Sequence, residues 1–423
     1  MFEDKDSNYL AFNIYQSPFY LYLCKMIADD STIKVAIIGA GAAGCFCAAN
    51  LSRMLPQCDI TIFERARRPM AKLAITGGGR CNLTNTFAEI TSLSQAYPRG
   101  WRLMERLFRQ FSPMDTRKWW EEAGVPLVVQ PDQCIFPRSQ DAMQVVNTLL
   151  RLMREANVKI LTSTKIETLP QGFDIIVITT GGNPRIESLS YLSELDLSLE
   201  PPVPSLFALN VYDPNLQALT GIVVEDCLVS IAGTKFEAQG PLLITHFGMS
   251  GPAILRLSSY AARYLAEEDY SVKLIVNWMQ GENEEQVQSE LLEYLQSTKQ
   301  TGNHHPRHIT ARHWLYLLER ASIPNDKPWN ALNKKDVNRL VNVLTADVYQ
   351  TEGRRQYKAE FVTCGGISLR SINPNTLALK SHPNIYLAGE VLDVDAITGG
   401  FNLQAAWTMG YVVAKSIAKS QAI

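Results

Sequence analysis

Hydrophobic and polar positions follow two different periods along this chain, and each change of period predicts a new element. Two β-branched runs, Lys34–Ile38 and Asp59–Phe63, carry apolar residues at most positions. Such runs are typical of strands that are buried on both faces of a parallel sheet. Small and apolar residues at 45–55 lie between the two runs and predict a helix. This strand–helix–strand order predicts an α/β fold that begins near residue 33.

Later segments repeat the helical period or alternate as strands do. Helices are predicted at 103–111, 115–123, 141–157, 252–267, 284–298, 310–321, 334–346 and 405–419. Strands are predicted at 125–129, 134–136, 159–161, 165–167, 173–178, 206–211, 222–229, 235–240, 242–245, 271–277, 356–362 and 383–388. The regular short strands between 206 and 277 indicate a small barrel or sandwich in the middle of the chain.

The composition excludes several classes of protein. The chain has 423 residues, of which 46% are hydrophobic and 19% charged, as in ordinary globular proteins. Its 40 Lys and Arg residues nearly balance 42 Asp and Glu residues, so it lacks the basic excess of a dedicated nucleic-acid binder. No apolar stretch predicts a membrane span. We therefore expect a cytoplasmic protein with neither a nucleic-acid nor a membrane partner; the oligomeric state stays open.

The cysteines and the first residues add two expectations. Eight cysteines are scattered without a CxxC pair, which is typical of free thiols in a reducing compartment. Residues 1–32 are rich in aromatic side chains, start with acidic residues and are interrupted by Pro18, unlike a signal peptide. We expect them to form an extension outside the fold.

A glycine motif follows the first predicted strand directly. Gly39 allows a tight turn, Gly41 lets the backbone approach a pyrophosphate, and Gly44 permits close packing of helix on strand. Glu64 ends the second strand, twenty residues after Gly44, where a carboxylate binds ribose hydroxyls. The motif predicts a dinucleotide site, and an acid at position 64 disfavours a 2′-phosphate. The ligand is therefore NAD-like or FAD.

Two further glycine-rich blocks favour FAD. The first is Thr-Gly-Gly-Gly-Arg-Cys-Asn-Leu-Thr-Asn at 76–85, in which the three glycines lack Cβ atoms and let the backbone lie close to a ligand. The second runs from 388 to 404 and leads into a helix at Gly399-Gly400. A helix N-terminus favours the negative charge that develops on a flavin when it is reduced.

At this point the chain resembles the BaiN/YhiN-like family of flavoproteins, the aminoacetone-oxidase-like NAD(P)/FAD-dependent oxidoreductases. The resemblance rests on four blocks, at 39–44, 76–85, 245–252 (Thr-His-Phe-Gly-Met-Ser-Gly-Pro) and 388–404. The chain departs from the family after Gly182, where a Ser-Thr-Gly-Asp-Gly-Tyr-like stretch is missing, and at Ala396, where glycine is common. The missing stretch puts in doubt whether substrate and reductant handling carry over.

The resemblance implies a Rossmann-like FAD-binding domain that is split by an inserted β-barrel-like domain with a helical subdomain. We place the first part of the FAD domain at 33–200 and its second part at 361–423. The insert is expected at 201–280 and 350–360, with the helical subdomain at 281–349.

The cofactor-binding residues that we expect come from these blocks and from the ends of the predicted strands. They are Gly39, Ala40, Gly41, Ala42, Ala43, Gly44, Glu64, Arg65, Lys72, Thr76, Gly77, Gly78, Gly79, Arg80, Cys81, Asn82, Leu83, Thr84, Val129, Gly181, Gly182, Gly389, Glu390, Asp393, Gly400, Phe401, Asn402, Leu403 and Gln404. Asp393 is expected near the ribityl chain or the pyrophosphate, and residues 400–404 near the flavin ring.

Histidines and cysteines offer weaker candidates. His304, His305 and His308 invite a metal-site interpretation, but Pro306 interrupts the helix that would align them, and we expect a solvated loop. His246 is the candidate proton donor to reduced flavin or substrate, although a purely structural role is the stronger expectation. Cys81 has no second cysteine at relay spacing and is expected to pack structurally.

The sequence thus predicts an FAD-dependent oxidoreductase that transfers hydride between NAD(P)H and a small or apolar substrate. No second dinucleotide motif is visible, so NAD(P)H would dock directly at the flavin. Two alternatives stay open: a flavin-binding redox sensor without turnover, and an FAD-dependent RNA-modifying protein. The near-neutral charge argues against RNA, whereas a basic stripe at the cleft would argue for it.

Overall fold

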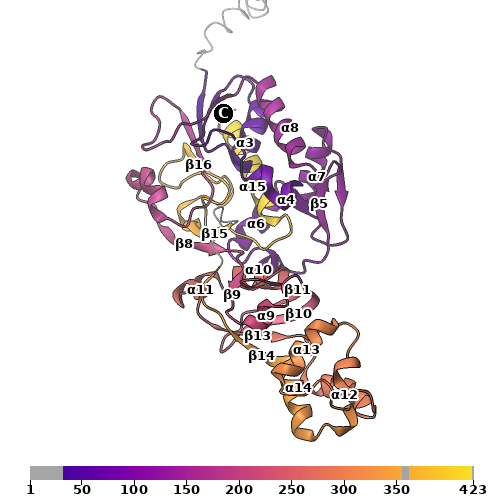
Figure 1. Cartoon of the computed structure of the whole chain (residues 1–423). Helices are drawn as coiled ribbons and strands as arrows, with labels where there is room; N and C mark the ends of the chain where they lie inside the picture. The colour runs from indigo at the N-terminus through magenta and orange to yellow at the C-terminus, as the bar shows by residue number, and fades with distance from the viewer. Residues whose placement is uncertain (1–31, 355–361, 422–423) are drawn as a thin grey trace, which may run out of the picture.

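The computed structural model describes residues 32–354 and 362–421 (Figure 1). The predicted N-terminal extension and nearly all of the predicted strand at 356–362 lie outside these residues.

The upper body in Figure 1, where β16 is labelled, contains a five-stranded parallel sheet. Its strand order is β16-β7-β1-β2-β6, so the first strand of the chain occupies the middle. The bounds are β1 Lys34–Ile38, β2 Asp59–Phe63, β6 Lys159–Leu161, β7 Ile175–Ile178 and β16 Ile385–Leu387. Four of the five residues of β1 are buried, as the nearly continuous apolar run predicts. The predicted strand at 165–167 is wrong: these residues form a loop after β6.

Both ends of the described chain contribute to this body. Helix α3 (Ala42–Met54) packs against α15 (Phe401–Ser420), and the two lie side by side in Figure 1. A Cβ on Gly410 would lie 2.7 Å from the Ala43 carbonyl oxygen, so the two backbones are in close contact. The rings of Phe46 and Trp407 meet 5.2 Å apart and fill the space beside this contact.

Smaller elements complete the upper body. They are α4 (Thr76–Gly79), α5 (Leu93–Ala96), α6 (Trp101–Phe108), α7 (Pro113–Glu122), α8 (Ala142–Glu155) and the sheet β3-β5-β4, with β3 Thr84–Asn85, β4 Leu127–Val129 and β5 Cys134–Pro137. Helix α7 begins at a capping box between Ser112 and Asp115, with Pro113 in its first turn.

The middle of the chain forms a six-stranded antiparallel sheet of order β14-β13-β10-β11-β12-β9. The bounds are β9 Leu209–Asn210, β10 Val223–Ile231, β11 Glu237–Thr245, β12 Gly248–Ser250, β13 Lys273–Asn277 and β14 Asp347–Gln350. The chain after β14 returns to β9, where Asn210 N donates to Gly353 O at 3.2 Å and Glu352 N to Asn210 O at 3.0 Å. Residues 352–353, just after β14, therefore connect the two edges of the sheet, which gives the insert a barrel-like curvature.

Helices cover this barrel-like sheet. The predicted helix at 252–267 is divided into α10 (Pro252–Tyr260) and α11 (Ala262–Glu267). Beyond it lie α12 (Glu284–Leu295), α13 (Ala311–Arg320) and α14 (Lys334–Ala346). Helix α14 has the predicted bounds, because Asn333 caps its first turn in a capping box with Asp336.

Two strands connect the bodies. Strand β8 (Leu199–Ser205) pairs antiparallel with β15 (Val362–Ile367). The proline-rich segment around 201–204, expected as a boundary, thus forms one strand of a two-stranded ribbon. Two hydrophobic clusters lie on either side: one draws residues from 35–195 and 367–417, the other from 207–349.

Within residues 32–354 and 362–421, no helix combines the length and the apolar character that crossing a membrane requires.

A buried histidine makes the second cluster sensitive to pH. His313 on α13 is 1% exposed, its ring lies 4.6 Å from that of Trp278, and its Nε2 has no hydrogen-bond partner among the described residues. Burial lowers the pKa of His313 from 6.5 to about 4. His313 therefore binds a proton below about pH 6.5 in the unfolded chain, whereas in the folded chain it stays neutral down to about pH 4.

The free energy of unfolding should accordingly contain a term of about 2 kcal/mol that is present at pH 7 and lost by pH 5. His313→Asn removes this titration, so its stability should depend less steeply on pH than that of the wild type over the same interval. Urea unfolding of both proteins at pH 7 and pH 5 measures the difference. Equal pH dependence of the two would contradict the prediction.

Candidate cofactor site

The turn between β1 and α3 is closed by two glycines that have no room for a side chain. Gly39 has φ +108°, and a Cβ there would lie 2.5 Å from Thr179 O. A Cβ on Gly44 would lie 2.1 Å from Gly39 O. These contacts hold the start of α3 against the ends of β1 and β7, as the motif predicts.

The middle glycine has the opposite surroundings. A Cβ on Gly41 would meet nothing within 4 Å. Gly41 is also the N-cap of α3, and no side chain caps the helix there. The first N–H groups of α3 and the positive end of its dipole therefore face open space, which is the arrangement that binds phosphate.

Glu64 lies beside this turn at the end of β2. Its carboxylate accepts the N–H of Ala40 at 2.8 Å and that of Ala66 at 2.7 Å. A carboxylate has about four acceptor positions, so these bonds orient Glu64 and leave it able to accept ribose hydroxyls. The sequence predicted that role from spacing alone.

A cavity of about 390 Å³ opens at the carboxyl ends of β1, β2 and β7. Four of the residues expected to bind the cofactor line it: Gly39, Glu64, Arg65 and Gly181. In open parallel sheets this edge is where ligands bind. The volume and position suit the adenosine half of a dinucleotide.

The sequence missed two segments of the cavity wall, 164–167 and 183–191. Both follow the carboxyl end of a parallel strand, and this place in the topology is the signal that would have found them. In the second segment Tyr191 lies 3.3 Å from the Thr180 hydroxyl, and burial raises the pKa of Tyr191 to about 12. Val129 instead lies on β4 and is not part of this wall.

The glycine loop at 76–80 has a left-handed backbone. Gly77, Gly78 and Gly79 have φ of 58°, 69° and 84°, which residues with side chains rarely adopt. Gly78 and Gly79 border open space, so a ligand can approach their backbone. Lys72 is exposed nearby, whereas Arg80 lies over the Phe136 ring at 4.7 Å.

Side chains of the second block connect it to α15. Thr84 Oγ1 donates to Gln404 Oε1 at 2.5 Å, and the Gln404 amide nitrogen donates to Thr116 and Thr408. Thr84 and Gln404 are both 0% exposed. Their side chains therefore hold two blocks together inside the protein and do not border the cavity. Asn82 bonds Thr84 O at 3.1 Å and Gly400 N at 3.3 Å once its amide is oriented to satisfy both.

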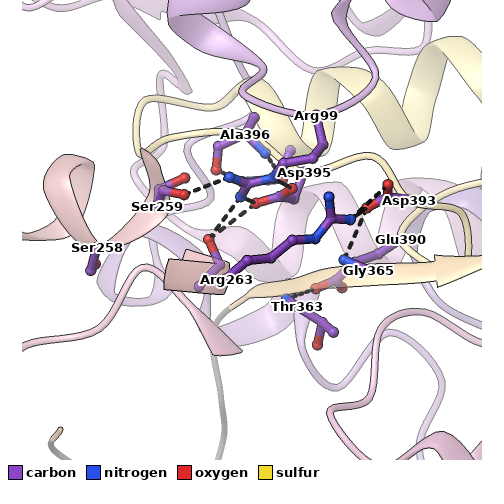
Figure 2. Close-up of polar contacts among 12 residues, drawn as sticks. Arg99, Ser258, Ser259, Arg263, Thr363, Gly365, Glu390, Asp393, Asp395 and Ala396 are labelled. Carbon is purple, nitrogen blue, oxygen red and sulfur yellow. Dashed lines mark hydrogen bonds and ion pairs between the residues drawn. The ribbon is translucent and has the colours of Figure 1, made fainter. Parts of the chain in front are cut away.

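The fourth block carries three acids into the contact with the ribbon and the insert (Figure 2). Glu390 accepts the N–H of Thr363 at 2.6 Å, and Asp393 accepts that of Gly365 at 3.1 Å. Asp395 forms an ion pair with Arg99. Burial raises the pKa of Asp395, although the Arg99 guanidinium opposes this shift. No sequence motif pointed to Arg99.

His246 lies in the turn between β11 and β12 and is exposed. Its ring meets that of Phe247 edge-on at 5.0 Å. It is not among the residues that line the cavity. A role for His246 in proton transfer stays a prediction.

Cysteines and metal ligands can be placed in the same way. Cys81 is 0% exposed, and burial raises the pKa of its thiol to about 12, so it is protonated at neutral pH. Within residues 32–354 and 362–421, no group of three or more His, Cys, Asp or Glu side chains is arranged to hold a metal ion.

Known proteins resemble the chain over most of its length. It is 28% identical over 409 residues to a ribosomal RNA dihydrouridine synthase of Escherichia coli K12, covering 90% of this chain and 97% of the relative. It is 26% identical over 416 residues to a 3-dehydro-bile acid delta(4,6)-reductase of Clostridium scindens, covering 91% and 99%. The 3-ketosteroid delta1-dehydrogenase structure from Sterolibacterium denitrificans matches with TM-score 0.47 and 11% identity, covering 92% of this chain and 100% of that one.

A family model, the HI0933-like protein Rossmann domain, matches residues 33–416. This range includes both halves of the cofactor site and the whole insert. The chain therefore belongs to the HI0933-like Rossmann family of FAD-dependent oxidoreductases.

Proposed function

We propose that this protein is a reductase that uses FAD to add hydride to one carbon of an electron-poor carbon–carbon double bond, while the other carbon takes a proton, with NAD(P)H as the electron donor. The observation that supports the cofactor is the open space at Gly41, next to a cavity of about 390 Å³ that Glu64 and Gly181 line. The oxygens of a pyrophosphate in that space would accept hydrogen bonds from the free N–H groups of α3. The residues present therefore fit FAD.

Each part of the site would hold a different part of the cofactor. The 39–44 turn would hold the pyrophosphate, Glu64 the adenosine ribose, and the 76–80 and 399–402 loops the flavin end. When bound, FAD supplies reversible two-electron chemistry that no amino-acid side chain offers. The chain binds and orients it, and the uncapped start of α15 at Gly400 would favour negative charge on the reduced form.

The names of the two relatives support the reaction class. A dihydrouridine synthase and a bile acid delta(4,6)-reductase both add hydrogen across a carbon–carbon double bond. In uridine and in a 3-oxo steroid such a bond is conjugated to a carbonyl, which makes it electron-poor and able to accept hydride. We therefore propose this shared chemistry for the present chain.

A specific observation keeps RNA as the second candidate substrate. Between Glu64 and Asn82 the chain carries five basic residues and no acid: Arg65, Arg67, Arg68, Lys72 and Arg80. All five are exposed, and none forms an ion pair among the described residues. This segment runs from the cavity to the glycine loop and is the basic stripe that would suit a phosphate backbone.

The cofactor and the donor can be tested together. Protein produced with riboflavin available should carry FAD in about one-to-one ratio and absorb at ~450 nm. Anaerobic addition of NADH or NADPH should bleach that band, and a substrate should restore it with turnover. If the protein takes up no flavin, the whole proposal is wrong. Bleaching without turnover on any substrate would indicate a redox sensor.

The substrate class can be separated with one pair of variants. Reoxidation of the reduced protein by a conjugated 3-oxo steroid should be the same in the wild type and in the Arg67→Ala, Arg68→Ala double variant. Reoxidation by uridine-containing RNA should fall about tenfold in the variant and weaken as salt rises. Reoxidation by neither compound would contradict both substrate proposals.

The glycine cradle gives a matched pair of substitutions. Gly41→Ala should leave the thermal midpoint nearly unchanged, since its Cβ meets no atom, yet weaken FAD binding at least tenfold because the methyl group lies where the pyrophosphate would. Gly44→Ala should instead destabilise the fold, since its Cβ would lie 2.1 Å from Gly39 O. Wild-type FAD affinity in Gly41→Ala would show that the phosphates lie elsewhere.

A further inference from the structure

The insert meets the upper body, which holds the candidate cofactor site and is called the cofactor body below. The two meet at a group of charged side chains that have no part in the proposed function. The two bodies are joined by the β8–β15 ribbon. Any change in the orientation of the insert must therefore bend this ribbon or slide it over the loop at 389–396. This loop lies between β16 and α15, and its acids contact the ribbon (Figure 2).

The inner part of the group is a buried ion pair with extra partners. Arg99, just before α6, binds both oxygens of Asp395 and donates to Ser259 O at the end of α10 at 2.6 Å. Ser205 at the end of β8 donates to Asp395 at 3.0 Å. The side chains of Arg99 and Asp395 are 12% and 0% exposed. Removing either residue of such a pair is costly, because the charge of the other residue would be left buried and unpaired.

The outer part is more accessible. Arg263 on α11 reaches Asp393 with a single nitrogen, Nη2, at 3.0 and 2.9 Å from the two carboxylate oxygens. Asp393 also accepts the N–H of Gly365 on β15. The Arg263 side chain is 43% exposed and that of Asp393 is 14% exposed. One carboxylate of the loop is thus held by a helix of the insert and by the ribbon together.

The same loop is also hydrogen-bonded to the start of α15, where the flavin end of the cofactor is proposed to lie. Asn402, in the first turn of α15, accepts the N–H of Ala396 at 2.9 Å and donates to the carbonyl of Ala396 at 2.8 Å. Ala396 directly follows Asp395. The chain from Asp393 to Asn402 is therefore fixed at both ends, by the insert at one and by α15 at the other.

We propose that Arg263 is a positioning residue, which fixes Asp393 and through it the 389–402 segment that would hold the flavin end of the cofactor. The Arg99–Asp395 pair is the fixed support of this arrangement, and the Arg263–Asp393 pair is its adjustable part. The inference rests on FAD binding as proposed above, but not on the substrate or on the electron donor.

Hydrogen–deuterium exchange of the full-length protein tests this directly. Arg263→Gln removes the charge, so amides at 389–402 should exchange several-fold faster than in the wild type, while amides at 34–54 should be unchanged. Arg263→Lys should restore slow exchange, because one ammonium can replace the single nitrogen that contacts Asp393. Arg151→Gln is the matched control, since it removes an arginine from an exposed ion pair with Glu155 on α8.

The dissociation constant of FAD is the second readout. It should rise about tenfold in Arg263→Gln, and stay within about twofold of the wild type in Arg263→Lys and Arg151→Gln. Wild-type exchange and affinity in Arg263→Gln would overturn the proposal, as would a lower thermal midpoint without either change. Failure of the wild type to bind FAD refutes the proposed function instead, and the exchange rates still report on Arg263.

Discussion

The packing of α3 against α15 is the contact on which the rest of the cofactor body depends. Gly410 lets the two helix backbones touch, and Phe46 and Trp407 fill the space beside them. The helices come from opposite ends of the described chain, and each begins at a glycine-rich turn. Their contact therefore brings two uncapped helix starts into one body, where they can serve the two ends of a single extended cofactor.

Buried polar groups add precision to this apolar contact. The Gln404 amide bonds Thr408 on its own helix and also Thr84 and Thr116, so one side chain joins α15 to both β3 and α7. A buried amide is costly when unsatisfied, which makes one arrangement of these segments strongly preferred. The loops that border the open space can then consist of glycine, because their positions are determined from behind and not by their own side chains.

The insert is connected to the cofactor body by ion pairs as well as by the β8–β15 ribbon. Its ribbon supplies only two strands, yet Arg99 joins the α6 side of the cofactor body, the end of α10 and the loop before α15. A charged contact of this kind is directional and depends on geometry, whereas an apolar contact tolerates sliding. It suits a place where the orientation of one body relative to another matters for what lies between them.

Local pattern predicted a large part of this structure. The parallel strands, the β-rich insert, α14 and the tight packing at Gly39 and Gly44 follow from periodicity, capping and motif spacing, which act within a few residues. The predicted strand at 165–167 fails because apolar alternation over three residues cannot distinguish a strand from a loop at a cavity. The contact of Gln404 with the flavin ring stays a prediction; its side chain is buried among three threonines, a direction that its position in the block does not reveal.

The sequence by itself determined that a dinucleotide turn exists, that two other glycine blocks accompany it and that a β-rich segment interrupts them. Only the tertiary structure decided which side chains line the cavity and which lie behind it. It also paired Arg99 with Asp395 and Arg263 with Asp393, across 296 and 130 residues. Contacts across such distances leave no periodic trace in a single sequence, because the folding of the intervening chain, and not the spacing, brings the partners together.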